Sequence, residues 1–343
     1  MPTRWRRARA GYVRWRAMNA KSAYVGVDLG GTNFSIAVGD AKGRIAVEEK
    51  HATRSHEGPE AVLGRIATAI KGFAAYQAGD IAGIGIGLPG LVDIREGVSR
   101  FLPNLPTQWR DVPVRARLEE ALRCPVRILN DARAAALGEF LFGHGRSGLN
   151  TLVFLTLGTG VGGGVVVNGR LRLGQMGAAG EIGHICVDPH GPWCGCGSRG
   201  CLETFASGPA ITAEGIRLML SGNAPRLHAN CGGDIASVSP STMAVAARQG
   251  EASVAFALSQ VGERIGMAVA HVVSALHPDA VVLGGGVSAL DELLLEPIRR
   301  MLDARVKMFP AQSVRVLRAQ LGDRAGVYGG LAAAIRGDLQ EEI

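Results

Sequence analysis

Residues 23–40 read AYVGVDLGGTNFSIAVGD, which predicts a strand, a glycine-rich turn and a second strand. The same order returns at residues 151–171, which read TLVFLTLGTGVGGGVVVNGRL. Glycines in such a turn let backbone N–H groups approach a phosphate closely, because no side chain stands in the way. The two stretches together predict an internal duplication, with one phosphate-binding hairpin in each half of the protein.

The segments around the two hairpins alternate between predicted strands and predicted helices. They are a third strand at 44–53, a helix at 59–78, a buried strand at 81–90, a short strand at 126–129, a long helix at 254–276, a strand at 279–288 that contains three glycines, and a final helix that opens at 326. The order in the first half resembles an actin-like, ribonuclease-H-like nucleotide-binding domain. We therefore expect an α/β protein with the duplicated two-lobe ATPase fold and a cleft between the lobes. The small lobe is placed at 22–133 together with 326–343, the large lobe at 134–325, and the hinge near 131–135.

The composition is that of an ordinary globular protein. Of 343 residues, 47% are apolar and 20% are charged, which excludes bulk disorder. No run of about 18 uncharged apolar residues occurs, so a transmembrane helix is not expected. The net charge of +7 belongs to residues 1–21, which hold seven basic residues and no acidic one, whereas the rest of the chain is neutral. The charge therefore does not predict a nucleic-acid-binding surface on the body of the protein.

Residues 1–21 form a basic arm that lacks the apolar core of a secretory signal, and we expect a cytoplasmic protein. An arginine-rich arm with Trp5, Tyr12 and Trp15 could bind RNA or an anionic membrane surface. We favour a disordered extension, for which a true start at Met18 is one explanation. We therefore expect neither a nucleic-acid nor a membrane partner.

The DLGGT motif places a carboxylate beside a candidate phosphate loop. Asp28 ends the predicted strand and can face Mg²⁺ through water, and Gly30, Gly31 and Thr32 form the turn. Alone, the motif is equally compatible with an ordinary glycine-rich hairpin. The second loop, residues 158–164, has the same character, and the pair favours phosphate binding. Neither loop is a Walker A P-loop, since the chain has no GxxxxGK[ST] pattern.

Asn130 and Asp131 lie where a predicted strand passes into a predicted helix. An aspartate at such a position is most often a helix cap. An enzyme that phosphorylates a sugar hydroxyl also needs a carboxylate there, because the attacking hydroxyl must lose its proton. The segment alone favours the cap, whereas the remaining motifs favour the base.

The sharpest signal lies at residues 181–203, which read EIGHICVDPHGPWCGCGSRGCLE. One histidine and three cysteines within 18 residues match a closed tetrahedral zinc site. The predicted ligands are His184, Cys194, Cys196 and Cys201. Four protein ligands leave no open position, so this zinc would be structural; the alternative is a set of ordinary thiols in a glycine-rich loop. Cys124, Cys186 and Cys231 lack such spacing, and we interpret them as buried or incidental.

Taken in order, these motifs resemble the ROK family of sugar kinases and transcriptional repressors. They are DLGGT, the ND pair before a helix, LGTGVGGG, ExGH and CxCGxxGCxE, and the similarity extends over about residues 22–337. Repressors of the family carry an N-terminal winged helix-turn-helix, for which the 21 residues before the organised part are too few. The resemblance therefore implies a kinase rather than a regulator.

The resemblance also implies a role for each matching residue. Asp131 corresponds to the catalytic base on the sugar 6-hydroxyl. The residues that would contact the sugar are Gly90, Asn104, Asn130, Asp131, Glu181, His184 and Glu203. The residues that would bind ATP are Asp28, Gly30, Gly31, Thr32, Gly158, Thr159, Gly160, Gly208, Gly284, Gly285 and Gly286. One departure concerns the helix start: the usual NDANAAA is NDARAAA here, and Arg133 puts the local hydrogen bonding in question.

The activity implied is phosphorylation of a hexose by ATP and Mg²⁺, supported by structural Zn²⁺, and we favour a glucokinase that makes glucose 6-phosphate. The short spacing from His184 to Cys194 and the PNLPxxW segment at 103–109 are more typical of glucokinases than of fructokinases. N-acetylmannosamine and N-acetylglucosamine kinases are the alternative, and a sugar-sensing regulator is the alternative outside the enzymes. Polyphosphate is left open as a phosphoryl donor. The family further implies a homodimer.

Overall fold

The computed structural model describes residues 22–102 and 105–336, and these form two compact units. Of the described residues, the first unit contains 22–102, 105–148, Gly164–Gly180 and 324–336. The second unit contains Leu149–Gly163 and Glu181–Asp323. The basic arm and Asn104 lie outside the described residues, so the expectations for them stay predictions.

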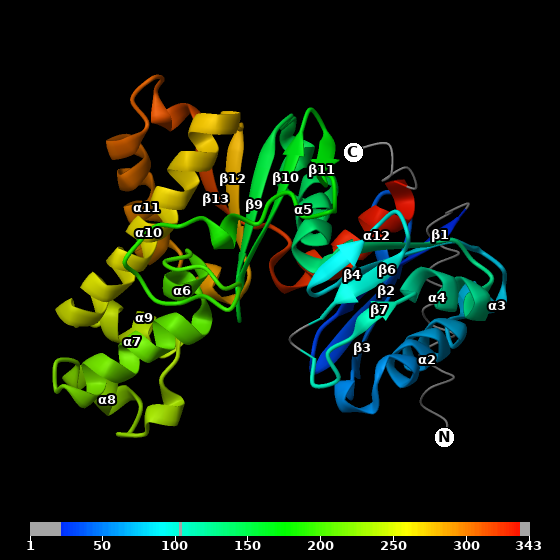
Figure 1. Ribbon diagram of the computed structural model, residues 1–343, viewed down its shortest axis with the longest axis horizontal. Coiled ribbons are helices and arrows are strands. Elements are labelled where there is room, and N and C mark those ends of the chain that lie inside the picture. Colours follow the sequence, from blue (N-terminus) through cyan, green and yellow to red (C-terminus); the bar gives the residue numbers. More distant parts are fainter. Residues whose placement is uncertain (1–21, 103–104, 337–343) are drawn as a thin grey trace. The chain divides into compact units, whose positions relative to one another are not determined.

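A five-stranded mixed sheet organises the first unit (Figure 1). Its strands, in spatial order, are β3 (Ile45–Ala52), β2 (Asn33–Gly39), β1 (Ala23–Leu29), β4 (Ile81–Leu88) and β8 (Val126–Asn130). The last three run parallel to one another, whereas β2 is antiparallel to both of its neighbours. Parallel strands end at the same edge of a sheet, which is where α/β proteins bind their ligands. We therefore expect a ligand-binding site at the carboxyl ends of β1, β4 and β8.

Helices cover both faces of this sheet. They are α2 (Pro59–Lys71), α3 (Ala74–Gln77), α4 (Val114–Leu122), α5 (Asp131–Phe142) and α12 (Ala325–Arg336). The backbone of α12 lies so close to β1 and β4 that a side chain at Gly26 or Gly85 would clash with it. Gly138 of α5 and Gly329 of α12 allow an equally close contact between those helices. Figure 1 shows α2 and α4 on the opposite face, so α12 completes the core of the first unit.

A small antiparallel sheet that the sequence did not predict follows β4. Its strands are β5 (Leu91–Asp93), β6 (Val98–Phe101) and β7 (Arg110–Val112). The Arg100 side chain on β6 forms ion pairs with Asp93 at 2.7 Å and with Asp111 at 2.9 Å. Strands of three or four residues are too short to show the period-two alternation that identifies a strand in a sequence.

A second five-stranded sheet has the same plan, and its three parallel strands belong to the second unit. Its spatial order is β11 (Arg170–Arg172), β10 (Val161–Val167), β9 (Leu152–Leu157), β12 (Ala280–Gly284) and β13 (Arg315–Arg318). The last three are parallel, and β10 and β11 form an antiparallel hairpin. β10 begins in the second unit, but its residues from Gly164 onward and all of β11 belong to the first unit. Both sheets thus join an antiparallel hairpin to three parallel strands, which is the predicted duplication.

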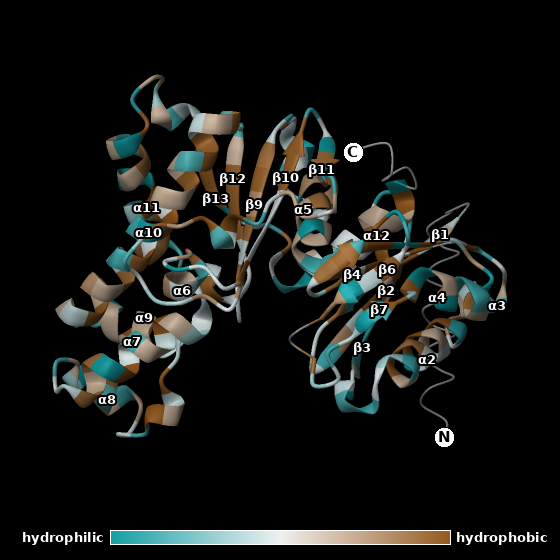
Figure 2. Ribbon diagram, viewed as in Figure 1, coloured by the Kyte–Doolittle hydropathy of each residue, from teal (hydrophilic) through white to brown (hydrophobic). Residues whose placement is uncertain are grey.

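The second unit carries most of the helices. They are α6 (Glu203–Ala206), α7 (Gly208–Leu220), α8 (Pro225–Asn230), α9 (Pro240–Arg248), α10 (Ala252–Leu276) and α11 (Glu292–Arg305). The long α10 ends where His277 adopts a positive φ of 43° and Pro278 follows. Figure 2 colours β9 and β12 as hydrophobic, and every residue of β12 is buried. These central strands form the core of the unit.

The helix predicted at 59–78 is interrupted. It ends as α2 at Lys71, and α3 begins only at Ala74. Between them Phe73 is extended, with φ −78° and ψ 137°, and its side chain is buried. Gly72 lowers the helix propensity at this point, and burial of the Phe73 ring fixes the extended backbone. Among residues 22–102 and 105–336, no helix has both the length and the apolar character needed to span a membrane.

Candidate active site and metal centre

The carboxyl ends of the parallel strands in the first unit bring predicted site residues together. Asp28 on β1 is in register with Gly87 on β4, and Asn130 at the end of β8 is in register with Leu88. Asp131 follows as the first residue of α5. A side-chain carbon at Gly87 would lie 3.5 Å from the Asp131 Cα and 3.8 Å from the Asp28 Oδ1. The two aspartates therefore belong to one cluster at this edge of the sheet.

The surroundings of this cluster raise the pKa of Asp28. Its carboxyl group is largely buried, and burial, together with the nearby charge of Asp131, raises its pKa from 3.8 to about 6. Gly326, at the start of α12, packs so tightly on the carboxylate that any side chain there would clash. A carboxyl group in such surroundings either takes up a proton near neutral pH or has its charge offset by a cation. The cluster is therefore suited to the Mg²⁺ contact predicted from DLGGT.

Asn130 supplies the side-chain cap of α5. Its Oδ1 accepts hydrogen bonds from the backbone N–H groups of Ala132 at 3.0 Å and Arg133 at 3.3 Å. Its Nδ2 donates to the carbonyl oxygen of Gly90 at 3.0 Å, which fixes the turn after β4. The Oδ1 of Asp131 accepts a hydrogen bond from the neighbouring Ala132 N–H at 2.8 Å. The capping role considered for Asp131 is thus largely met by Asn130.

Arg133 stands where the family motif has asparagine, and its side chain is buried with 2% of its surface exposed. Its Nη1 donates to the Asn130 Oδ1 at 2.8 Å, and its Nε donates to the carbonyl oxygen of Ala179 at 3.1 Å. A buried guanidinium needs such acceptors, because desolvating an unpaired charge is costly. The departure from the motif therefore keeps the helix start intact and ties it to the segment Gly164–Gly180 of the same unit.

The first glycine hairpin is held by its immediate neighbours in the first unit. The Gly30 N–H donates to the carbonyl oxygen of Asn33 at 3.0 Å, and the Thr53 N–H donates to that of Thr32 at 2.8 Å. The buried Thr53 hydroxyl donates to the carbonyl oxygen of Gly30 at 2.7 Å. Gly31 and Thr32 at the tip are exposed. The hairpin can thus present N–H groups and one hydroxyl to an anion.

The second glycine hairpin, residues 158–160, is held by segments far along the chain in the second unit. The N–H of Gly208, at the start of α7, donates to the carbonyl oxygen of Gly158 at 2.7 Å. The Oε2 of Glu203 accepts from the Val161 N–H at 2.9 Å. It also lies against Gly160 so closely that a side chain there would clash. Glu203 therefore fixes one end of the hairpin.

The triple-glycine turn after β12 approaches the same hairpin. At Gly285 φ is +77°, and a side chain there would clash with the backbone of Leu157, the residue before the hairpin. Gly286 opens a short 3₁₀ helix that ends at Leu290. The glycines predicted to bind the adenosine and those predicted to bind the phosphates are thus neighbours within the second unit.

The four predicted metal ligands form one cluster in the second unit. Their ligand atoms all lie within 4.8 Å of one another, in the set His184, Cys194, Cys196 and Cys201. The sulfurs of Cys196 and Cys201 are 3.7 Å apart, and the Cys194 sulfur is 3.7 Å from the His184 Nδ1. In a tetrahedral site with zinc–sulfur bonds of about 2.3 Å, neighbouring ligand atoms are ~3.7 Å apart. The geometry and the donor set both fit a closed Cys₃His zinc site.

The protonation of the buried thiols also fits a metal site. Burial raises the pKa of Cys201 to about 12 and raises the pKa of Cys194. The pKa of the exposed Cys196 is lowered, mainly by a hydrogen bond from the Ser198 N–H. The two buried thiols would stay neutral at pH 7 unless a cation stabilised their thiolates, which a divalent metal does. Outside the cluster, Cys231 is buried and Cys124 is half-buried, but Cys186 is exposed rather than buried.

Predicted sugar-binding side chains surround the metal cluster. The His184 Nε2, the ring nitrogen not directed at Cys194, lies 3.7 Å from the Glu181 Oε2. The Glu203 Oε1 lies 3.8 Å from the Cys194 sulfur, while the other oxygen of this carboxylate binds Val161. Glu203 thus links the metal cluster to the second glycine hairpin.

Sequence reasoning missed the residues that support these sites. Thr53 bonds Gly30 across 23 positions of the chain, and Arg133 bonds Ala179 across 46. Thr53 belongs to no motif, and Arg133 appeared only as a departure from one. For Thr53 the available signal was a hydroxyl residue at the end of the strand predicted at 44–53; the structure shows it fully buried.

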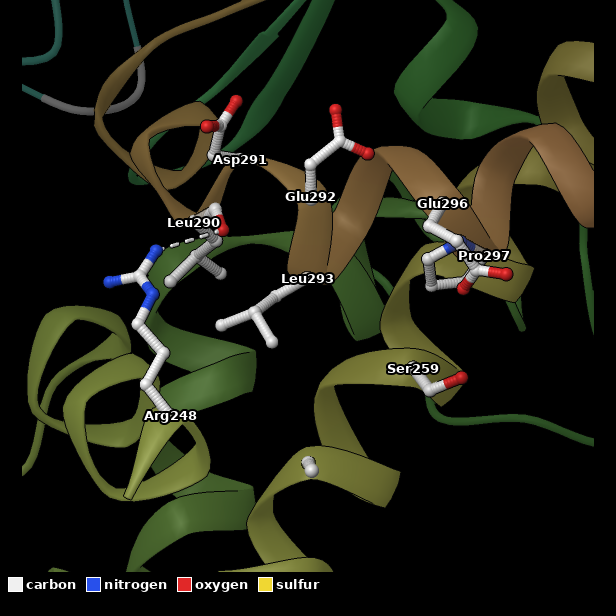
Figure 3. A pocket seen from close by; sticks show the side chains of 9 residues that line it. Arg248, Ser259, Leu290, Asp291, Glu292, Leu293, Glu296 and Pro297 are labelled. Atoms are coloured by element: carbon white, nitrogen blue, oxygen red, sulfur yellow. Dashed lines mark hydrogen bonds between the residues drawn. The ribbon is translucent and has the colours of Figure 1, made fainter. Parts of the chain in front are cut away.

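A separate hollow lies in the second unit beyond the triple-glycine turn (Figure 3). It is lined by Arg248, Ala255, Ser259, Leu290, Asp291, Glu292, Leu293, Glu296 and Pro297. The Nη2 of Arg248 donates to the carbonyl oxygen of Leu290 at 3.3 Å across it, as Figure 3 shows. None of the predicted site residues lines this hollow, and we assign it no part in the function.

Known proteins resemble this chain over most of its length. The sequence profile of the ROK family matches residues 24–336. A glucokinase from Halalkalibacterium halodurans is 38% identical over 314 residues, which are 90% of this chain and 93% of that protein. The crystal structure of a ROK family glucokinase from Streptomyces griseus in complex with glucose and AMPPNP superposes with a TM-score of 0.78 at 36% identity, covering 92% of this chain and 100% of that one. A xylose repressor from Caldicellulosiruptor bescii is 32% identical over 314 residues, which are 91% of this chain and 77% of the repressor.

The chain belongs to the ROK family. The likeness to the Streptomyces griseus glucokinase and the two sheets of common plan confirm the predicted actin-like α/β fold. The relatives include glucokinases and xylose repressors, so membership of the family does not by itself decide between an enzyme and a regulator.

Proposed function

We propose that this protein is an ATP-dependent hexokinase that phosphorylates the 6-hydroxyl of glucose. The observation that carries the proposal is the aspartate cluster of the first unit, in which Asp131 lies beside Asp28 at the carboxyl ends of parallel strands. Glucokinases at 36–38% identity over about 90% of the chain support glucose as the sugar. A regulator without catalysis has no need of a carboxylate pair with this electrostatic coupling.

The proposal gives Asp131 the role of general base. Asn130 caps α5 and holds the Gly90 turn, so the position of the carboxylate at the first residue of the helix is fixed. The Asp131 carboxylate accepts the proton of the 6-hydroxyl as the hydroxyl oxygen attacks the γ-phosphorus. General-base catalysis of this kind contributes ~10²–10⁴ in rate. Most of the remaining acceleration of phosphoryl transfer comes from positioning and from neutralising charge.

The two glycine hairpins would bind the ATP phosphates through backbone N–H groups, helped by the Thr32 and Thr159 hydroxyls. Gly208 and the triple-glycine turn, which contact the second hairpin or its strand, would hold the adenosine. Mg²⁺ bound with ATP would offset the phosphate charge and face Asp28 through water. That contact would also relieve the unfavourable burial of the Asp28 charge.

Zinc would support sugar recognition without taking part in the chemistry. With Nδ1 bound to the metal, the imidazole of His184 presents Nε2 to a sugar hydroxyl, next to Glu181. Glu203 would accept a second hydroxyl from its position between the metal cluster and the hairpin. Asn104 and Asn130 complete the set of sugar contacts in this proposal, together with Gly90 against the ring. We further expect a cytoplasmic homodimer.

A panel of sugars with ATP and Mg²⁺ tests the proposal. Glucose should give the highest kcat/KM among glucose, mannose, fructose, N-acetylglucosamine and N-acetylmannosamine, and mass spectrometry should place the phosphate on the 6-oxygen. A preference for an N-acetylated sugar would support the proposed kinase activity but show that glucose is not the preferred substrate. Replacing ATP by polyphosphate identifies the phosphoryl donor.

The similarity to xylose repressors defines the competing function, a protein that binds a sugar as a signal. Calorimetric binding of xylose or glucose without any turnover in the presence of ATP and Mg²⁺ would favour it. Turnover of a hexose at more than ~1 s⁻¹, the lower end of typical enzymes, would exclude it.

A further inference from the structure

Cys186 is an exposed cysteine next to the metal cluster that the zinc ligand set does not use. It lies two positions after His184, and its side chain is exposed, whereas the ligand Cys201 is fully buried. Exposure makes the thiol accessible to oxidants in solution. Whether it can form a disulfide depends on which cysteine lies opposite it on the paired segment.

Cys186 lies directly opposite Cys201 on two short antiparallel segments. The hydrogen bonds on either side run from Val187 N–H to the Gly200 carbonyl at 2.8 Å and from Leu202 N–H to the Ile185 carbonyl at 2.9 Å. Because these bonds flank the two cysteines, the cysteines form a non-hydrogen-bonded pair. In such a pair the Cα atoms lie ~4.5 Å apart and the side chains share one face, and a disulfide needs a Cα separation of ~4.4–6.8 Å. The backbone therefore already meets the requirement for a Cys186–Cys201 disulfide.

The two segments are held together firmly. Gly200 has a φ of 66°, and a side chain there would clash with the carbonyl group of Asp188. Its N–H donates to the carbonyl oxygen of Pro192 at 2.8 Å. The pairing of the cysteines thus rests on a fixed loop geometry rather than on a passing contact.

Cys201 cannot bind zinc and form a disulfide with Cys186 at the same time. Its sulfur lies 3.7 Å from that of Cys196, inside the metal cluster. A sulfur that enters a disulfide loses the thiolate charge through which it binds zinc. The metal would keep three ligands, whereas structural zinc sites use four. A Cys186–Cys201 disulfide and a complete zinc site therefore exclude each other.

We infer that Cys186 and Cys201 are an oxidisable pair whose disulfide releases the structural zinc. With hydrogen peroxide as oxidant, the two sulfurs lose two electrons and form one S–S bond, while the peroxide O–O bond breaks and yields two water molecules. One proton comes from the Cys186 thiol and one from solvent, and the zinc leaves as Zn²⁺ without a change of oxidation state. A dithiol reductant reverses the step. This inference rests on the proposed zinc site but not on the identity of the sugar.

Oxidation of the cysteine pair should also affect sugar binding, because the metal loop positions Glu203. This residue is two positions after Cys201, and its carboxylate binds the Val161 N–H of the second glycine hairpin. Release of zinc would free the loop that positions Glu203. Oxidation should therefore weaken sugar binding by about the same factor as removal of a zinc ligand, ~10–100-fold.

Peptide mapping of the oxidised protein tests the pair directly. The zinc-loaded full chain is treated with hydrogen peroxide, zinc release is followed with a chromophoric chelator, and free thiols are then blocked with N-ethylmaleimide. Trypsin cleaves after Arg172, Arg199 and Arg217, and Asp-N cleaves before Asp188. Cys186 then lies in peptide 173–187, Cys194 and Cys196 in 188–199, and Cys201 in 200–217. We expect a disulfide between peptides 173–187 and 200–217, formed in step with zinc release.

Two variants provide the comparison. Cys186→Ser keeps all four ligands and should release zinc about tenfold more slowly than wild type, because Cys196, the exposed cysteine that remains beside Cys201, is itself a proposed zinc ligand. Cys124→Ser, a matched change of a half-buried cysteine in the first unit, should release zinc at the wild-type rate. Equal rates for Cys186→Ser and wild type, or a wild-type disulfide that involves peptide 188–199, would overturn the inference. If purified wild-type protein contains no zinc, both the zinc site and the release of zinc are overturned. If no disulfide joins peptides 173–187 and 200–217, only the Cys186–Cys201 pair is overturned.

Discussion

The hairpin of residues 30–32 and the hairpin of residues 158–160 differ in what holds them. The first is held by Thr53, which directly follows β3. The hydroxyl and the N–H of Thr53 donate to carbonyl oxygens of the turn. In the second, the supports come from Glu203, Gly208 and the triple-glycine turn, more than 40 positions further along the chain. Two hairpins that look like copies in the sequence therefore depend on different parts of the protein. The first should respond to changes in its own sheet, and the second to changes in the metal loop.

The largest effect is expected at the aspartate cluster beside the first hairpin. Asp131→Asn should lower kcat ~10²–10⁴-fold, because the amide cannot accept the proton of the attacking hydroxyl. The hydrogen bond from the Ala132 N–H can persist to the amide oxygen, so sugar KM should change little. A coupled assay for the sugar phosphate measures both constants. Turnover within a few-fold of wild type would remove Asp131 from the role of base.

The second prediction concerns stability and pH in protein free of nucleotide and Mg²⁺. The folded-state pKa of Asp28 is raised to about 6, so its favourable contribution is complete below about pH 4 and is lost as the pH rises through 6. Asp28→Asn should therefore be more stable than wild type at pH 8, by at most ~3 kcal/mol, and the difference should vanish near pH 4. Urea denaturation at several pH values measures it.

Asp93→Asn is the matched control for this experiment. The pKa of Asp93 is lowered, first by the hydrogen bond from the Glu96 N–H and then by the Arg100 guanidinium. Its charged form stabilises the fold above the ordinary carboxyl pKa, so this variant should be less stable than wild type at pH 8. The same sign of change in both variants would contradict the assignment of the raised pKa to Asp28.

The third prediction acts on the second hairpin through the metal loop. Cys196→Ser should lower zinc from about one ion per chain, reduce the melting temperature and raise sugar KM ~10–100-fold, because His184 and Glu203 lose their support. ATP KM should rise only a few-fold, since the first hairpin and the Gly208 contact are untouched. Elemental analysis and steady-state kinetics provide the readouts. Normal sugar binding in a zinc-free variant would separate the metal from the sugar site.

A smaller effect is expected from the support of the first hairpin. Thr53→Val preserves the side-chain shape but removes the hydroxyl that binds the Gly30 carbonyl, at a cost of about 1 kcal/mol. ATP KM should rise a few-fold, while zinc content and sugar KM stay the same. Thr68→Val, which removes a hydroxyl bond inside α2, is the control and should leave both KM values unchanged. A change in zinc content on Thr53→Val would show that the two hairpins are not independent.

The smallest effect is expected from the basic arm. Deletion of residues 1–20 should leave kcat and both KM values unchanged, because every predicted site residue lies beyond it and the remaining chain is neutral. Parallel kinetics of the two proteins suffice to check this. A tenfold loss of activity in a folded truncation would assign the arm to the enzyme.

The sequence predicted well those parts of the molecule whose signal is local. The strands around both glycine turns, the long helix that became α10 and the metal cluster all depend on periodicity or on spacing within a few dozen residues. The break at Phe73 was missed because the apolar spacing of 59–78 continues through it. A helical pattern cannot reveal that one of its apolar residues is buried on an extended backbone.

The supporting contacts of the site could not be predicted, because each joins segments whose approach depends on the whole fold. Arg133 appeared as a departure from a motif, and nothing near it in the sequence points to the Ala179 carbonyl that receives its Nε–H. Cys186 likewise has no spacing that marks it. Only the antiparallel pairing of its segment with that of Cys201 gives it a partner.

The tight packing of α12 on Gly26 and Gly85 has a consequence for how the protein is made. The strands that this helix covers leave the ribosome among the first parts of the chain, yet α12 is the final helix described. At ~5–20 residues per second, synthesis of the intervening residues 89–324 takes ~12–47 s. During that interval the apolar face of β1 and β4 lacks its cover, and a chaperone that holds exposed apolar strands has time to bind there. A stalled nascent chain that ends before residue 325 should therefore be far more sensitive to protease in its first unit than the finished protein.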